Sequence, residues 1–162
     1  MEALYQALAP RIYALLIRIL GSREEAEEAL QDTFLKLCRE AWRYDPRRGD
    51  PATFAYAIAR NLALSRLRQR RRLPPRADLD PDDPEGDREI ALGFREGGHE
   101  ERVVAKQALE SLSPEEHQLL EEAFYLGLSH RELAQRHNLP LGTVKARIRR
   151  ALLKLRERLG ET

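Results

Sequence analysis

The sequence has very little cysteine: Cys38 is its one thiol among 162 residues. A single cysteine excludes a disulfide and a cysteine-ligated zinc site within one chain. The sequence also lacks an uninterrupted apolar run of about eighteen residues, and its N-terminus lacks the charged segment and cleavage site of a signal peptide. We therefore expect a cytoplasmic protein without membrane insertion.

Groups that could carry catalysis are also scarce. The histidines lack the i, i+4 spacing of metal ligands, no glycine-rich phosphate loop with a lysine occurs, and no nucleophile stands beside a base. The histidines concerned are His99, His117, His130 and His137. We expect no catalytic residue, no metal and no cofactor, and hence no enzyme.

Charge is what the sequence has in abundance, and it is distributed unevenly. The formal net charge of +1 conceals a charge of +5 in residues 1–73, −6 in 74–100 and +2 in 101–162. Four prolines and four glycines in the acidic segment interrupt regular structure. We predict an all-α protein with helical domains at 1–73 and 101–162, joined by a flexible acidic linker at 74–100.

The first domain has clear helix boundaries. Gly21 predicts the end of a first helix, Ser22 with Glu25 a capping box, and Asp50-Pro51 the start of a third helix. Apolar residues recur at helical spacing between these boundaries, and no strand-like alternation is present. They are Leu4, Leu8, Ile12, Leu15, Leu16 and Ile19, and then Ala26, Leu30, Phe34, Leu37 and Ala41.

The second helix carries a leucine among polar residues on the face opposite its apolar stripe. This face comprises Glu28, Gln31, Asp32, Leu35 and Arg39. An exposed leucine there favours a patch that docks on another helix. The alternative is a solvated face with one stray apolar residue.

The third helix begins apolar and ends cationic. Phe54, Ile58 and Leu62 are expected in the core, with polar residues along a separate face: Asn61, Ser65 and Arg68. Arg60 and the arginines between Arg66 and Arg72 are expected to contact phosphates. Amide, aromatic and guanidinium groups together suit unstacked single-stranded bases. The alternative is a solvated basic end of a helix.

The second domain has the spacing of a helix-turn-helix. A capped helix from Ser129 to about His137, a turn at 138–142 and a last helix from about Thr143 to Leu159 predict this arrangement. The core stripe of the last helix is Val144, Ile148, Leu152 and Leu155. The residues placed for reading bases are Lys145, Ala146, Arg149 and Arg150, and those placed for phosphates or solvent are Arg147, Lys154 and Arg158. The alternative is an ordinary surface helix with salt bridges.

Three stretches in this order resemble the small, two-domain extracytoplasmic-function (ECF) branch of bacterial sigma factors. SREEAEEALQDTFLKL resembles the segment that docks on the clamp helices of the polymerase β′ subunit. YDPRRGDPATFAYAIARNLALSRLR resembles the segment that melts and recognises the minus-ten element. The stretch from LSPEEH to LLKLR, with its GTVK-x-R core, resembles the domain that reads the minus-thirty-five element.

The resemblance implies roles and partners for the residues above. Core RNA polymerase, through its β′ clamp helices and β subunit, would bind Glu28, Gln31, Asp32, Leu35 and Arg39. Minus-ten promoter DNA would contact Asp50, Thr53, Asn61, Ser65, Arg66 and Arg68. Minus-thirty-five DNA would contact Thr143, Lys145, Ala146, Arg147, Arg149 and Arg150. An anti-sigma factor is a further implied partner.

The sequence departs from the family pattern at three positions. The family often has tryptophan where Cys38 and Phe54 stand, and an apolar aromatic residue where Pro51 stands. Pro51 changes the loop that captures a minus-ten base in the family, which bears on base preference. The rival hypothesis is a stand-alone helix-turn-helix regulator that binds DNA without polymerase.

Overall fold

The computed structural model describes residues 2–48, 50–74 and 106–158. All regular structure in these ranges is helical, which confirms the predicted all-α fold. The chain divides into two compact units, Met1–Pro75 and Arg76–Thr162. The predicted linker at 74–100 lies outside the described residues apart from Pro74, as do residues 101–105.

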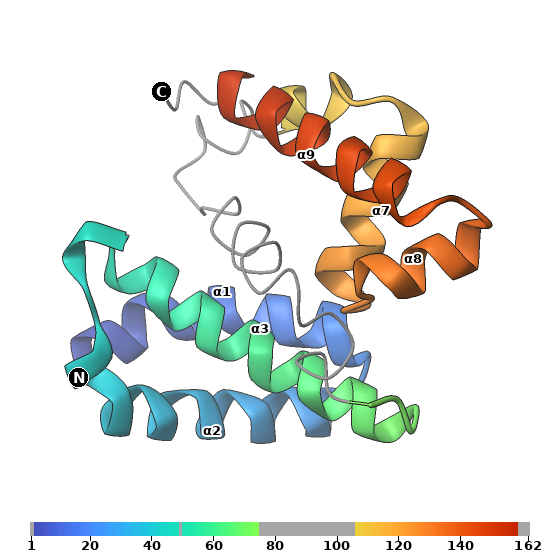
Figure 1. Ribbon diagram of the computed structural model, residues 1–162. Coiled ribbons are helices and arrows are strands. Elements are labelled where there is room, and N and C mark those ends of the chain that lie inside the picture. The colour runs from blue at the N-terminus through green and yellow to red at the C-terminus, as the bar shows by residue number, and fades with distance from the viewer. Residues whose placement is uncertain (1, 49, 75–105, 159–162) are drawn as a thin grey trace. The chain divides into compact units, whose positions relative to one another are not determined.

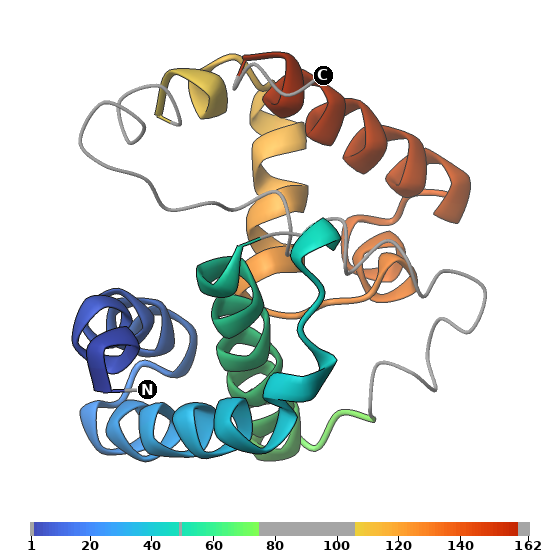
Figure 2. The same ribbon diagram turned by 90° about the vertical axis from the view of Figure 1, so that its left-hand side faces the viewer.

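In the first unit α1 (Glu2–Leu20), α2 (Arg23–Glu40) and α3 (Pro51–Arg70) each pack against the other two (Figures 1 and 2). The short 3₁₀ segments η1 (Ala41–Arg43) and η2 (Pro46–Arg48) connect α2 to α3. This arrangement gives α3 two helices to bury residues against, and it leaves one side of α2 facing away from both neighbours.

The helix boundaries of this unit follow the predicted signals. Gly21 ends α1 with a left-handed φ of 72°, a conformation that glycine adopts without steric cost. The Ser22 hydroxyl accepts a hydrogen bond from the backbone N–H of Glu25 at 3.3 Å, so Ser22 caps α2. Asp50 caps α3, with Pro51 at the first helical position.

The buried stripes differ from the predicted ones. On α2, Ala26, Phe34 and Leu37 are buried as expected. Leu30 is only half-buried and Ala41 is exposed, whereas Ala29 and Thr33 are buried instead. On α3, Ile58 is buried while Phe54 and Leu62 are only half-buried. The buried set on α3 is wider because the helix contacts both α1 and α2: Ala55, Tyr56, Ile58, Ala59, Ala63, Leu64 and Leu67.

Length and composition alone would let α1 cross a membrane, a test that the core helix of a soluble protein also passes. Ile12 and Leu16 of this helix are completely buried against its neighbours. Pro10 lies inside α1 without ending it. α1 therefore buries one face against α2 and α3.

In the second unit α7 (Pro114–Tyr125) and α8 (His130–His137) both begin with complete capping boxes, at Ser113 and Ser129. α9 (Leu141–Arg158) follows α8 after a short turn and packs against α7 and α8. Residues 106–110 are also helical. All four residues predicted for the core stripe of α9 are buried: Val144, Ile148, Leu152 and Leu155.

The turn between α8 and α9 is shorter than predicted. Asn138 adopts the left-handed conformation, with φ of 52°, and its N–H donates to the carbonyl groups of Ala134 and Gln135. The Pro140 carbonyl then accepts hydrogen bonds from the backbone N–H groups of Thr143 and Val144. α9 consequently begins at Leu141, and Leu141 and Gly142 belong to its first turn.

Candidate polymerase and nucleic-acid interfaces

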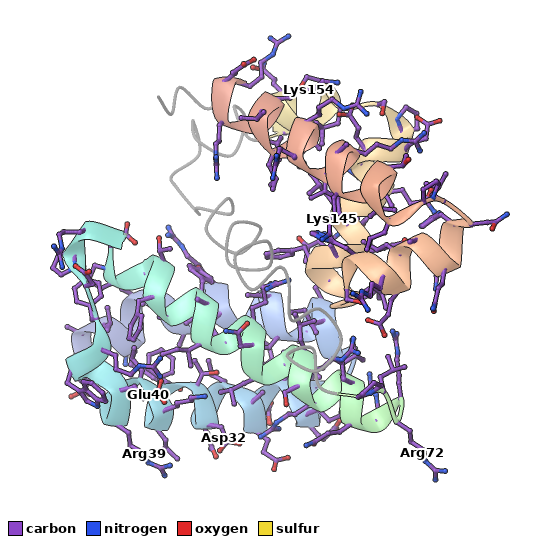
Figure 3. The ribbon with its side chains drawn as sticks, in the orientation of Figure 1. Asp32, Arg39, Glu40, Arg72, Lys145 and Lys154 are labelled. Carbon is purple, nitrogen blue, oxygen red and sulfur yellow. The ribbon has the colours of Figure 1, made fainter. Side chains whose placement is uncertain are left out.

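The α2 outer face, defined as Glu28, Gln31, Asp32, Leu35 and Arg39, lies on the exposed side of the first unit. Figure 3 shows Asp32 and Arg39 on this outer side of α2. The side chain of Leu35 is 54% exposed, and the other four residues of the face are polar. The five residues share one accessible surface, as the helical spacing predicted.

Sequence reasoning missed Trp42, the most exposed large apolar residue described. Trp42 lies in η1 directly after α2 and is 81% exposed. Leu35, Cys38 and Trp42 follow i, i+3, i+7 spacing, and all three are exposed. That spacing was the available signal, and it extends the apolar part of the α2 outer face toward η1.

Two arginines of α3 are engaged with acidic residues of α2. Arg66 pairs with Asp32, and its Nη1 lies 3.8 Å from Oε2 of Glu28. Arg70 donates from Nη1 to Oε2 of Glu25 at 2.7 Å and from Nη2 to the carbonyl oxygen of Leu20 at 3.2 Å. The cationic end of α3 is thus joined to acidic residues of α2 between Glu25 and Asp32.

Two further arginines of α3 are buried, so their predicted placement is wrong. Arg68 was expected on an exposed face with Asn61 and Ser65, but it is only 3% exposed and its Nε donates to the carbonyl oxygen of Pro74 at 2.8 Å. A residue after the helix thus accepts a hydrogen bond from Arg68. Arg60, expected to contact phosphates, is also buried.

Six polar residues of α3 and its end are exposed: Asn61, Ser65, Gln69, Arg70, Arg71 and Arg72. Neither Arg71 nor Arg72 forms an ion pair within the described part of the chain, and Figure 3 shows Arg72 extending outward from the end of α3. Their side chains are therefore free to meet an anionic ligand.

Asp50 and Thr53, both predicted to contact minus-ten DNA, are occupied with each other. Oδ1 of Asp50 accepts from the backbone N–H and from the hydroxyl of Thr53, each at 2.8 Å. Thr53 is also buried. Their geometry is that of a helix cap, so any contact with DNA falls to the exposed side of Asp50.

The polar residues of α9 fall on two sides of the helix. Thr143, Arg147, Arg150 and Lys154 follow i, i+4, i+7, i+11 spacing, and the last three line an open cleft of about 310 Å³ against the start of α7, with Ser113, Glu115 and Glu116. Lys145 and Arg149 lie on the other side, and the exposed Ala146 lies between the two sides. The residues predicted to read DNA are thus accessible or half-buried.

Lys154, placed by the sequence for phosphate or solvent, has an internal partner. Its Nζ donates to Oε1 of Glu116 at 2.7 Å, which ties α9 to α7. Burial would raise the pKa of the Glu116 carboxyl, but the hydrogen bonds from Lys154 and from Ser113, with the charge of Lys154, hold that pKa below its usual value. Lys154 therefore contributes to the packing of this unit.

The three histidines in the described part of the chain differ in burial and contacts. His137 contacts Oε2 of Glu122 at 2.5 Å, and Arg136 donates to Oε1 of Glu122 at 3.1 Å, so that α8 is fastened to α7. His130 is buried at the start of α8, and His117 is exposed. Within the described ranges, no group of three histidine, cysteine, aspartate or glutamate residues could hold a metal ion.

Comparison with known proteins shows the family to which the chain belongs. Residues 4–73 match Sigma-70 region 2, and residues 108–157 match Sigma-70, region 4. The ECF RNA polymerase sigma factor RpoE of Cereibacter sphaeroides is 34% identical over 157 residues, which cover 97% of this chain and 84% of the relative. This chain belongs to the ECF branch of the sigma factors.

Other relatives agree with this family. The ECF RNA polymerase sigma factor SigK of Mycobacterium tuberculosis is 32% identical over 158 residues, covering 94% of this chain and 81% of the relative. Among solved structures, the sigma factor RpoE in complex with the anti-sigma factor NepR from Bartonella quintana has a TM-score of 0.41 and 23% identity, covering 98% of this chain and 96% of that one.

As a member of this family, the protein is a sigma factor that directs transcription initiation. The region 2 match covers the first unit, which a stand-alone helix-turn-helix regulator has no need of. The stand-alone regulator is therefore not favoured.

Proposed function

We propose that this ECF sigma factor docks on core RNA polymerase through the α2 outer face. The observation that carries the proposal is the exposure of Leu35 among the polar residues of that face. A leucine that is half exposed has apolar surface to bury, and the surrounding charges and amide can orient the partner. Trp42 extends the same surface and adds a large aromatic anchor at its η1 end.

Promoter DNA is the second proposed partner. Asn61 and Ser65 are exposed along α3, where they can meet the unstacked bases of the opened minus-ten strand, while Arg71 and Arg72 bind its phosphates. In the second unit, Arg149 and Arg150 read bases of the minus-thirty-five element in the major groove, and Arg147 contacts the backbone.

The setting of this activity is also proposed. The protein acts in the cytoplasm, has no catalytic activity of its own, and binds the β′ clamp helices and the β subunit of polymerase. An anti-sigma factor is a further proposed partner, because the resemblance of the chain to this branch of sigma factors implies one. An inhibitor would have to cover at least one of the surfaces above.

Leu35→Arg tests the polymerase contact. We expect the variant to fold normally, since residue 35 is exposed, and to bind core polymerase at least about tenfold more weakly because a charge replaces an apolar contact. Gel filtration with core polymerase and run-off transcription measure the effect. Ile17→Arg is the matched control, because Ile17 is an exposed apolar residue of α1 in the same unit. Equal assembly by both variants would contradict the proposed docking face.

A further inference from the structure

Resting on the proposed function, we propose that Asp32 and Glu28 withhold the Arg66 guanidinium from DNA until polymerase docks. The two carboxylates belong to the α2 outer face, and both contact Arg66 of α3. A partner that binds these carboxylates on α2 therefore releases a cation on α3. Asp32 and Glu28 act as positioning residues that couple the polymerase contact to the DNA contact.

The carboxylates are accessible while they hold the arginine. The side chain of Asp32 is 44% exposed and that of Glu28 is 70% exposed, whereas that of Arg66 is 26% exposed. Figure 3 shows Asp32 on the outer side of α2, where a partner can reach it. Ion pairs this open to water contribute little stability, so a docking partner can exchange them at small cost.

The charge of α2 indicates the chemistry of that partner. Residues 23–32 of α2 carry five carboxylates against one arginine, Arg23: Glu24, Glu25, Glu27, Glu28 and Asp32. Complementarity favours basic side chains on the polymerase surface that meets this part of the helix. Those side chains would compete with Arg66 for the same carboxylate oxygens.

Arg70 differs from Arg66 in its partners. It binds Glu25 and also the carbonyl oxygen of Leu20 at the end of α1, so a backbone group holds it in addition to a carboxylate. Glu25 lies more than two helical turns from Leu35 on α2. Arg66 contacts Asp32 and Glu28 of the α2 outer face itself, so it is the arginine that docking can release.

Coupling of this kind is reciprocal. If polymerase increases the affinity of the sigma factor for the minus-ten strand by freeing Arg66, the strand must increase the affinity for polymerase by the same factor. The free sigma factor then binds the strand weakly, and the assembled holoenzyme holds one additional phosphate contact.

Asp32→Asn tests the coupling in the full-length protein without polymerase. Binding of a fluorescent single strand with the minus-ten sequence is measured by anisotropy at several salt concentrations. We expect affinity about two- to fivefold above that of the unchanged protein, in line with an exposed ion pair. We also expect the slope of log affinity against log salt to be steeper by about 0.7, the value for one added phosphate contact on a single strand.

Glu27→Gln is the matched control, because it removes the same charge from an exposed residue of α2 that has no contact with Arg66. Equal affinity and equal salt slope for Asp32→Asn and Glu27→Gln would overturn the inference. Circular dichroism checks the fold, and Glu28→Gln, with the longer contact, gives a smaller effect in the same direction.

Unmodified holoenzyme binding to the same strand separates the two proposals. If the holoenzyme binds the minus-ten strand but the two variants of the free protein behave alike, only the coupling is wrong. If the holoenzyme fails to bind the strand, the proposed function of α3 is wrong.

Discussion

The helices α3 and α9 are both rich in arginine, but their arginines differ in burial and in ion pairing. On α3, Arg66 and Arg70 pair with acidic residues of α2, while Arg60 and Arg68 are buried. On α9, the arginines near its start form no ion pair within the described residues: Arg147, Arg149 and Arg150. The number of arginines in a helix therefore overstates the charge that a ligand can meet.

Neighbouring helices explain the difference. Arginines at the end of α3 find partners within the unit, because residues 23–32 of α2 hold five carboxylates and two of those arginines pair with them. α9 lies against the start of α7, where Glu116 engages Lys154 and the arginines of the cleft keep their accessible sides. The arginines near the start of α9 are consequently available to a ligand, whereas Arg66 and Arg70 of α3 are engaged in ion pairs within their unit.

The largest expected effect is on the recognition of minus-thirty-five bases by α9. Arg149→Ala or Arg150→Ala should each weaken binding to the cognate minus-thirty-five element by about 1–3 kcal/mol and relax its sequence preference. Because the two arginines lie on different sides of α9, we expect the relaxed base pairs to differ between the variants. Binding to a library of randomised elements measures this. A uniform loss on every sequence would show that both arginines contact only phosphates.

An intermediate effect concerns the internal ion pair of the second unit. The pKa of Glu116 is lowered in the folded state, so its contribution to stability is complete above the usual value near 4.5 and is lost as the pH falls through the lower folded-state value. Glu116→Gln should remove this acid sensitivity and cost within about 1 kcal/mol at neutral pH.

Amide hydrogen exchange in α7 and α9 at several pH values measures the change. Glu110→Gln is the control, since Glu110 is exposed and forms no ion pair within the described residues. If the unchanged protein and Glu116→Gln lose protection in parallel below pH 4.5, the Glu116–Lys154 pair does not govern the acid response of this unit.

Local signals predicted much of this fold. Caps at Ser22, Asp50, Ser113 and Ser129 depend on residues three apart in the chain, so the sequence alone shows them. The core stripe of α9 was also predicted correctly, because α9 buries a single face. The exposed α2 outer face follows from the same helical spacing.

The fate of individual arginines could not be predicted in this way. Arg66 and Asp32 are 34 positions apart, and their pairing depends on how α2 and α3 pack. Arg68 donates to the carbonyl oxygen of Pro74, a contact that depends on a residue beyond the helix. Long-range packing decides such contacts, and periodicity within one helix carries no information about it.

The smallest expected effect compares two arginines at the end of α3. In the free protein, Arg72→Ala should weaken binding to the minus-ten single strand by under about 1 kcal/mol and flatten the salt slope by about 0.7, because Arg72 is exposed and available to a phosphate. Arg66→Ala should leave that slope unchanged, since Arg66 is already engaged by Asp32.

In the holoenzyme both variants should flatten the slope. Salt titrations of strand binding, with and without core polymerase, measure all four cases. A flattened slope for Arg66→Ala in the free protein would mean that the ion pair leaves Arg66 open to DNA, and α3 would then resemble α9 more closely than its contacts indicate.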